Sequence, residues 1–490
     1  MKKTNGLFSD RRRSLNLIKN AAILILIIIT ALMLVDVFHT QNIHRGNMAA
    51  VSGGTTVEEI FQNPSDIDDE NISKAFWDYT SPAYIVVNKE GNRDILYSGT
   101  ADYASMCEPA MNIIKGMYGE VTAQEVLPDT EIWKNMLSVN SILMHFPADI
   151  DPEFQMQFLG ISQSAVTQNI ETFSDVLIVT GMPNQENAVI YIKESKKEDI
   201  VKLETKLPID ELNRGINSLE NINDKNYAFG YELKLDSYSG NSTMLSSMLT
   251  IPLVNIETTV ISAKVPENFS QKLLEVGQSE LSSNVLGIFG CDPDTVRSYI
   301  DSENSRILTG QNKRIALSSD GIIRFEADGA ENGIDITGAA VQTEANSLYV
   351  AISGTVKTIL GMFEITGTDI KNADYEIKLT EMSCSDDLQS EIRLSFDYYV
   401  NGLVMEYVDD PDSHAIEAVI SGGRLVSFKM ELKNFTKTEE TVSNEQMITA
   451  IDKYCGSHQT SGGVLYIRDS YLYYGYTKND EKMRTAWAVR

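Results

Sequence analysis

One uncharged, apolar segment near the start of the chain constrains its fold more than any other feature. Residues 21–35 read AAILILIIITALMLV without a charge, and Asp36, Val37 and Phe38 follow. As a helix, residues 21–38 would be about 27 Å long, close to the roughly 30 Å hydrocarbon core of a bilayer. Asp36 lies near enough to the end of the segment to reach the lipid headgroups. We therefore predict a single transmembrane helix at 21–38.

The charges before this segment predict its orientation. Residues 1–20 carry six Lys and Arg against one acid, and such a basic flank stays in the cytoplasm. We expect a cytoplasmic tail at 1–20, a helix in the cell membrane, and the rest of the chain outside the membrane. A cleaved signal peptide is the alternative, but its apolar region would be unusually long and residues 37–41 (VFHTQ) offer a poor cleavage site.

The exported part would be strongly acidic. The chain has 41 Lys and Arg against 69 Asp and Glu, and without the tail 35 basic and 68 acidic residues remain, a net charge of −33. A surface of this sign does not bind nucleic acid or anionic lipid by charge. Acidity by itself keeps an exported protein soluble. Neither acid run, at 66–70 or at 409–412, has the spacing of a calcium loop.

The exported part is also too long for one hydrophobic core. Runs of helical and of alternating apolar periodicity are mixed along it, so we predict an α+β fold with antiparallel sheets and flanking helices in two to three domains. The predicted parts are a linker at 39–73, an N-terminal α+β domain at 74–196, a middle α+β domain at 197–337 and a C-terminal hairpin-rich domain at 338–490.

The C-terminal region has the clearest local signals. Asn401-Gly402 separates two alternating apolar runs, 392–398 and 403–407, which is typical of a β-hairpin. A second hairpin is predicted at Gly422-Gly423, with the apolar residues of 428–432 on one face. Further predictions are turns at Gly91-Asn92 and 318–321, helices at 106–118, 151–159 and 268–280, helices bearing Trp133 and Leu212, a capping box at 443–446 that starts a helix, and a tyrosine-rich hairpin at 464–476.

The sequence holds none of the common enzyme signatures, such as His-Glu-x-x-His, Gly-x-Ser-x-Gly or a Walker loop. Of its five histidines, two lie in the linker. His145 lies in an apolar strand, where a hydrogen-bonded structural histidine is the usual case, and His414 and His458 lie in polar turns where we expect them solvated. A nucleophilic pair of Cys455 with His458 stays open. We expect no catalytic, cofactor-binding or metal-binding residue.

The cysteines and tyrosines each leave two interpretations. The cysteines are far apart and share no metal-ligand spacing, so we expect buried small apolar residues, with one disulfide left open. The C-terminal tyrosines predict half-buried strands, where tyrosine is favoured, or a flat surface for a protein or glycan partner. These residues are Cys107, Cys291, Cys384 and Cys455, and Tyr466, Tyr471, Tyr473, Tyr474 and Tyr476.

Several segments in the first two thirds of the chain resemble one protein family. Residues 131–134 (EIWK) and 143–152 (LMHFPADIDP) resemble the N-terminal domain of YycH proteins. Residues 288–297 (IFGCDPDTVR) are similar to that family's Phe-x-x-Asp-x-x-x-Val-Arg stretch, and a hairpin turn at Asp320-Gly321 follows as it does in the family.

The C-terminal region extends this resemblance. Residues 396–402 (FDYYVNG), the Gly422-Gly423 hairpin and Ala486-Trp487 look like the domain that YycH shares with its partner YycI. These marks follow the family's order over most of the exported chain. The strong acidity and the divergent middle region depart from the family, which leaves the partner kinase and the direction of regulation open.

The resemblance implies a non-enzymatic, single-pass regulator of an essential sensor histidine kinase that controls cell-wall metabolism, acting with a YycI-like single-pass protein. The family has no catalytic motif, so no site residue is carried over. Contact within the membrane would need close packing of the transmembrane helix against another helix. The small or polar residues that could make this contact could equally face lipid without consequence. The alternatives are a tethered envelope-binding module for peptidoglycan or a small ligand, and a hydrolase assembled from scattered residues. The candidate contact positions are Ala21, Ala22, Leu24, Ile28, Thr30 and Ala31.

Overall fold

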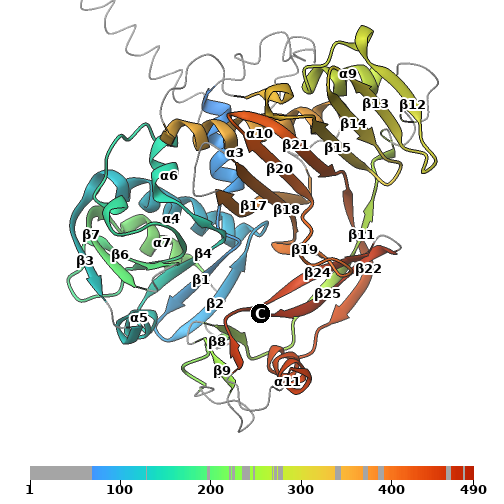
Figure 1. Ribbon diagram of the computed structural model, residues 1–490. Coiled ribbons are helices and arrows are strands. Elements are labelled where there is room, and N and C mark those ends of the chain that lie inside the picture. Colours follow the sequence, from blue (N-terminus) through green and yellow to red (C-terminus); the bar gives the residue numbers. More distant parts are fainter. Residues whose placement is uncertain are drawn as a thin grey trace, which may run out of the picture. The chain divides into compact units, whose positions relative to one another are not determined.

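The computed structural model describes residues 69–490 with short gaps (Figure 1). The predicted tail, the transmembrane helix, its six candidate contact positions and nearly all of the linker lie outside the described residues. Among the helices that are described, none is long and apolar enough to cross a membrane. The gaps fall at 128–129, 196–198, 220–221, 223–226, 234–242, 247–248, 268, 270–272, 274–279, 337–343, 368–372, 385–390, 459–464 and 478–479.

The first sheet has seven antiparallel strands in the order β2-β1-β4-β5-β6-β7-β3. Along the inner strand β4, Ile142 and Met144 belong to one apolar cluster and Leu143 to another, so successive side chains contribute to cores on opposite faces. The strands are β1 (Tyr84–Lys89), β2 (Asn92–Tyr97), β3 (Val121–Leu127), β4 (Ser141–Ile150), β5 (Phe173–Val179), β6 (Asn187–Glu194) and β7 (Ile200–Pro208).

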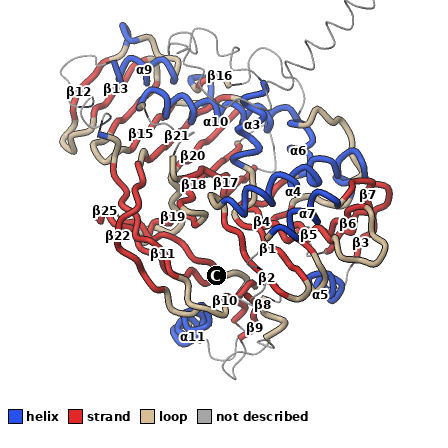
Figure 2. The backbone as a smooth tube through the Cα atoms, turned by 180° about the vertical axis from the view of Figure 1, so that it is seen from behind, coloured by secondary structure: helices blue, strands red, loops and turns tan. Residues whose placement is uncertain are grey.

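Helices cover both faces of this sheet. Figure 2 shows α4 (Ala101–Glu120) and α7 (Asp210–Ser218) on one face of the sheet, where the two helices contact each other. On the other face α5 (Thr130–Leu137) packs against β4 through the buried Trp133 and Leu137. Helix α6 (Pro152–Phe158) begins at its cap Asp151, whose carboxylate accepts the N–H of Glu153.

The second sheet follows the order β12-β13-β14-β15-β21-β20-β18-β19-β24-β25-β11-β22, with β16 beside β21 and β17 beside β18. Its pairs are antiparallel except for β19 with β24. The strands are β11 (Glu257–Lys264), β12 (Arg297–Ile300), β13 (Arg306–Gly310), β14 (Lys313–Leu317), β15 (Ile322–Ala327), β16 (Ile334–Asp335), β17 (Tyr375–Cys384), β18 (Ile392–Val400), β19 (Leu403–Tyr407), β20 (Ile416–Ser421), β21 (Arg424–Glu431), β22 (Asn434–Ser443), β24 (Ser470–Thr477) and β25 (Asp480–Val489).

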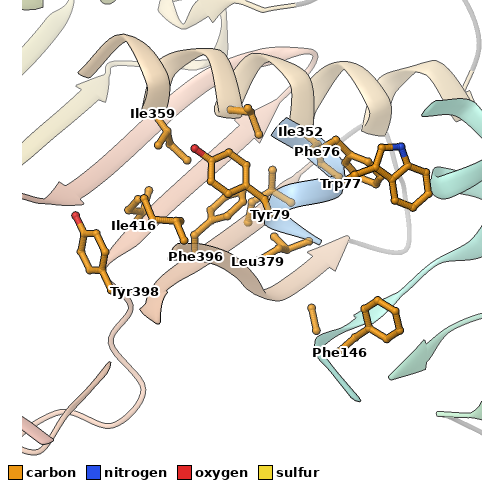
Figure 3. Close-up of a cluster of buried hydrophobic side chains, with 14 of the residues drawn as sticks. Phe76, Trp77, Tyr79, Phe146, Ile352, Ile359, Leu379, Phe396, Tyr398 and Ile416 are labelled. Atoms are coloured by element: carbon orange, nitrogen blue, oxygen red, sulfur yellow. The ribbon is translucent and has the colours of Figure 1, made fainter. Parts of the chain in front are cut away.

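One long helix, α10 (Glu344–Thr366), covers the centre of this sheet. Figure 3 shows Ile352 and Ile359 of α10 facing Phe396 and its apolar neighbours. Helix α3 (Asp69–Tyr79) also reaches this core, because the ring of Tyr79 lies 5.9 Å from that of Phe396. The remaining elements are α9 (Glu280–Ile288), α11 (Met447–Ser457), and two short pairs, β8 (Tyr227–Phe229) with β10 (Thr250–Pro252) and β9 (Thr243–Leu245) with β23 (Leu465–Ile467).

Strand pairing crosses both predicted domain boundaries. The boundary at 196/197 falls between β6 and β7, which are hydrogen-bonded neighbours, and the one at 337/338 separates β15 from its neighbour β21. The predicted linker ends at 73, whereas α3 begins at Asp69. All described residues lie in one compact unit, 57–490.

Most predicted turns and helices are confirmed. The turn at Gly422-Gly423, the turn at 318–321 and the helices at 106–118 and 151–159 are present, and α4 is longer than predicted because Thr100 caps it earlier. The first hairpin turns one residue earlier than predicted, at Glu90-Gly91, because Lys89 pairs with Asn92. The predicted helix at 268–280 lies largely outside the described residues.

The hairpin at Asn401-Gly402 is confirmed, with positive φ at both turn residues, but it is shorter than the two apolar runs suggest. Its strands separate after two pairs, and β18 pairs over most of its length with β17 and β20. Two other local predictions in the C-terminal region are wrong. The capping box is absent, since Ser443 ends β22 and the Gln446 cap makes no side-chain hydrogen bond. The tyrosine-rich strand β24 pairs with β25 rather than with 464–467.

Candidate functional site

His145 is a hydrogen-bonded structural histidine, as predicted. Its Nδ1 lies 2.9 Å from Asp175 Oδ1, and its ring stacks on Tyr84 at 4.7 Å. Burial lowers the pKa of His145, but the Asp175 carboxylate outweighs burial and raises it above the ordinary value. The two residues face each other across β4 and β5, where the pairing register places them side by side.

His414 is not solvated, and the prediction for it is wrong. Its Nδ1 lies 2.6 Å from Asp397 Oδ2 and its Nε2 lies 3.1 Å from Glu381 Oε2. Burial lowers the pKa of His414, but these two carboxylates together raise it above the ordinary value. Asp397 also accepts the N–H of Ala415 at 2.9 Å and the hydroxyl of Thr380 at 2.7 Å. The partners come from β17 and β18, whose adjacency to this turn no local sequence signal reveals.

The pair of Cys455 and His458 does not form a catalytic dyad. His458 is exposed, its ring stacks on Tyr454 at 4.1 Å, and its Nδ1 faces the Tyr454 carbonyl and the Ser457 hydroxyl. Cys455 is buried in the small apolar cluster below α11. All four cysteines are free thiols, two of them buried and two partly buried.

One buried polar region lies on one face of β21. Alternation along β21 and the two residues after it puts Phe428, Met430 and Leu432 in the apolar core, as predicted, and turns Lys429, Glu431 and Lys433 to the opposite face. The Glu431 and Lys433 side chains are only 3% and 5% exposed and form an ion pair at 2.9 Å.

Tyrosines from two other strands complete this cluster. Tyr407 of β19 donates its hydroxyl to Glu431 Oε2 at 2.6 Å, and the Tyr476 ring of β24 lies 4.9 Å from Lys433 Nζ. Burial opposes the charge of Lys433, but the Glu431 carboxylate raises its pKa above the ordinary value. The polar cluster at β21 (Glu431, Lys433, Tyr407 and Tyr476) is therefore paired internally.

A cavity of about 420 Å³ opens beside this cluster. Lys429 in its wall is fully engaged, with the Ser413 hydroxyl at 3.0 Å, the His414 carbonyl at 3.1 Å and the Glu417 carboxylate. Arg324 and Asp409 also line the cavity, and the described residues give their side chains no partner. The free groups thus carry both signs of charge, and the volume suits a small ligand.

The tyrosines of the C-terminal strands favour the half-buried interpretation. Tyr474 and Tyr476 are buried, while Tyr471 and Tyr473 are partly buried; only Tyr466 among the five is exposed, at 49%. Tyr471 donates its hydroxyl to Glu406, which Arg490 also contacts at 2.8 Å. Within the described part of the chain, no group of three His, Cys, Asp or Glu side chains could hold a metal ion.

The fold resembles that of a solved structure over most of its length. This is the crystal structure of YycH from Bacillus subtilis, with a TM-score of 0.52, 14% sequence identity, and coverage of 84% of this chain and 94% of that chain. No family model and no curated protein matches the sequence. The chain has a YycH-like fold, of mixed α and β structure with antiparallel sheets, so the predicted resemblance is confirmed at the level of fold.

Proposed function

We propose that this chain is a non-enzymatic, membrane-anchored regulator of a two-component sensor histidine kinase that controls cell-wall homeostasis. The observation that carries the proposal is the YycH-like fold over 84% of the chain. The YycH-like sequence segments support it, because they follow the family's order along the same region. In this proposal the N-terminus is cytoplasmic, residues 21–38 span the cell membrane, and the acidic part lies outside.

The chemistry of the described residues is compatible with regulation by contact. The two histidines with raised pKa values, His145 and His414, are each held by carboxylates in the sheets. The polar cluster at β21 satisfies its own charges. The partners would be the kinase and a YycI-like single-pass protein, with contacts both outside the membrane and within it.

Within the membrane, one helical face would carry the contact. At 100° per residue, Leu24, Ile28 and Ala31 fall within about 60° of each other. Ala21 and Ala31 supply small side chains on this face, and small side chains let two helices approach closely in lipid. The candidate positions Ala22 and Thr30 fall outside this face. Leu26 and Met33 fall on the opposite face.

An exchange of the anchor tests this proposal. Residues 21–38 are replaced by an unrelated transmembrane helix of equal length, and kinase output is read from a reporter gene under its control. We expect the regulatory effect to be lost. Protease accessibility of the outer part in whole cells is the control for correct insertion. Unchanged regulation by a correctly inserted exchange variant would contradict the proposal.

The cavity beside β21 favours one other function, a tethered module that binds a small ligand of the cell envelope. Its free Arg324 and Asp409 carry opposite charges, as a ligand with both a carboxylate and an ammonium group, such as a short peptide, would require. This module would keep its activity after the anchor exchange. Calorimetry with cell-wall peptides, comparing the natural chain with Arg324→Ala, tests it directly; no heat of binding would exclude it.

A further inference from the structure

One edge of the second sheet is open. Among the described strands, β12 pairs only with β13, and Figures 1 and 2 both show it as the outermost strand. All of its residues are exposed, and Tyr299 and Ile300 are 52% and 44% exposed. The unpaired N–H and C=O groups of an edge strand are a template for pairing with another strand. β12 is short and carries the charged Arg297, both of which weaken such pairing, but it has no lysine, proline or bulge.

The open hydrogen-bonding groups of this edge belong to Ser298 and Ile300. The N–H of Asp301 donates to the Ser305 carbonyl at 2.9 Å, so the backbone groups of Asp301 face β13. Backbone direction alternates along a strand, so Tyr299, paired with Ile307, also faces β13. The N–H and C=O groups of Ser298 and Ile300 therefore point away from the sheet.

Two opposite charges flank these groups. The described residues give Arg297 neither a hydrogen bond nor an ion pair. Asp301 uses Oδ1 to accept the N–H groups of Glu303 at 2.9 Å and Ser305 at 2.8 Å, and its Oδ2 is open. Arg297, Tyr299 and Asp301 alternate onto the same face of the strand. The edge is therefore self-complementary. When a second copy of the strand runs antiparallel to the first, Asp301 of one copy lies opposite Arg297 of the other.

We propose that β12 pairs with β12 of a second copy of this chain, antiparallel and with Tyr299 on the two-fold axis. Ser298 of each copy faces Ile300 of the other, and each such pair exchanges both backbone hydrogen bonds. Arg297 of each copy faces Asp301 of the other in a non-hydrogen-bonded pair, where side chains come closest. A register shift of two residues in either direction separates Arg297 from Asp301.

Attachment to a membrane, which is part of the proposed function, would strengthen this contact. Short strands bury less than the roughly 800 Å² per partner of a standard interface, so free copies in dilute solution would pair weakly. Copies held on one membrane surface meet at a much higher effective concentration. Vesicle flotation reports whether the chain is anchored, which distinguishes failure of the anchor from failure of the pairing.

Disulfide crosslinking of the full chain in lipid vesicles tests the proposed axis. Residues facing each other in a non-hydrogen-bonded pair have Cα atoms about 4.5 Å apart, within disulfide reach, so Tyr299→Cys is expected to give a covalent dimer on mild oxidation. Tyr466→Cys is the matched control, since Tyr466 is 49% exposed and lies away from this edge. The natural chain gives the background of its own cysteines. Equal crosslinking of the two variants would overturn the proposal.

Charge reversal tests the register. With Tyr299→Cys present, Arg297→Asp turns both attractive pairs into repulsive ones and is expected to slow crosslinking about tenfold. Arg314→Asp, on the exposed side of β14, should leave the rate unchanged. Asp301→Asn keeps the amide oxygen for the turn but removes the charge, and is expected to give an intermediate rate. A rate that Arg297→Asp does not change would overturn the register.

Discussion

The two large sheets bury their faces with different chemistry. The first sheet puts apolar residues on both faces, as along β5, where Val176 and Ile178 serve one cluster and Leu177 and Val179 the other. The second sheet is apolar on the face of Phe428 and Met430, but its opposite face at β21 holds an ion pair with less than a tenth of either side chain exposed. The first region also has charge pairs, Arg93 with Glu232 and His145 with Asp175, but in each of them at least one side chain is partly exposed. The second region differs in that both members of its ion pair are buried.

Because of this difference, the stability of the two regions responds to different changes. An apolar core responds to lost volume and hardly to pH, ions or ligands. A buried charge pair responds to any change that removes one partner, because the remaining charge is left without solvent or counter-ion. The polar cluster at β21 also lies beside the cavity of about 420 Å³, so a ligand bound in that cavity would act on this cluster directly.

The largest effect is expected from a cavity in the first sheet. Phe173 is fully buried and its ring lies 5.8 Å from that of Phe146. Phe173→Ala is expected to lower the free energy of unfolding of residues 57–490 by about 3–5 kcal/mol, measured by urea denaturation. Phe173→Leu, which leaves a smaller cavity, should lose clearly less. A loss below about 1 kcal/mol for Phe173→Ala would contradict a core held by packing.

Breaking the ion pair is expected to have the next largest effect. Glu431→Gln leaves Lys433 charged and buried, and should lower the free energy of unfolding by about 3 kcal/mol. The double variant Glu431→Met with Lys433→Met removes both charges and should lose less than the single variant. A double variant that loses as much as Glu431→Gln, or more, would contradict the claim that the unpaired charge of Lys433 causes the loss.

A smaller effect concerns pH. Carboxylates raise the pKa of His414 above its ordinary value, so charged His414 stabilises the fold fully below about pH 6.5, and this contribution is lost as pH rises through the raised pKa. His414→Gln should therefore lose about 1 kcal/mol near pH 6 and less at higher pH. His145→Gln should behave in the same direction in the first sheet. A loss that grows with rising pH would contradict both assignments.

The smallest effect is expected from an exposed pair on α5. Lys134 and Glu131 lie one turn apart at 2.6 Å, with side chains 26% and 64% exposed. Lys134→Ala is expected to change the free energy of unfolding by about 0.5 kcal/mol or less, because water screens such a pair. Thermal unfolding in low and high salt measures it. A change above about 1 kcal/mol would show that water does not screen this exposed pair.

The sequence predicts those structural features that depend on residues close together in the chain. Alternation at 428–432 predicted the core face of β21, and Gly422-Gly423 predicted its turn, because both signals are local. Helix α10 was missed because Ser353, Thr355 and Thr358 interrupt its apolar pattern; Thr355 and Thr358 satisfy their hydroxyls on carbonyls one turn back.

The polar sites could not be predicted, since their members come together only through long-range pairing. His414 meets Glu381 and Asp397 because β17, β18 and β20 are neighbours. The Glu431 carboxylate meets Tyr407 because β19 leaves its hairpin and pairs with β24. An alternating pattern shows which residues share a face, but not which distant strand covers that face.

The most direct test of the proposed function is photocrosslinking within the membrane. Photoreactive residues at Leu24, Ile28 and Ala31 are compared with the same groups at Leu26 and Met33 on the opposite helical face, and captured proteins are identified by mass spectrometry. We predict that the first face captures a sensor histidine kinase and a second single-pass protein, and that the opposite face does not. Capture of neither protein from either face would contradict a regulator that acts through its membrane helix.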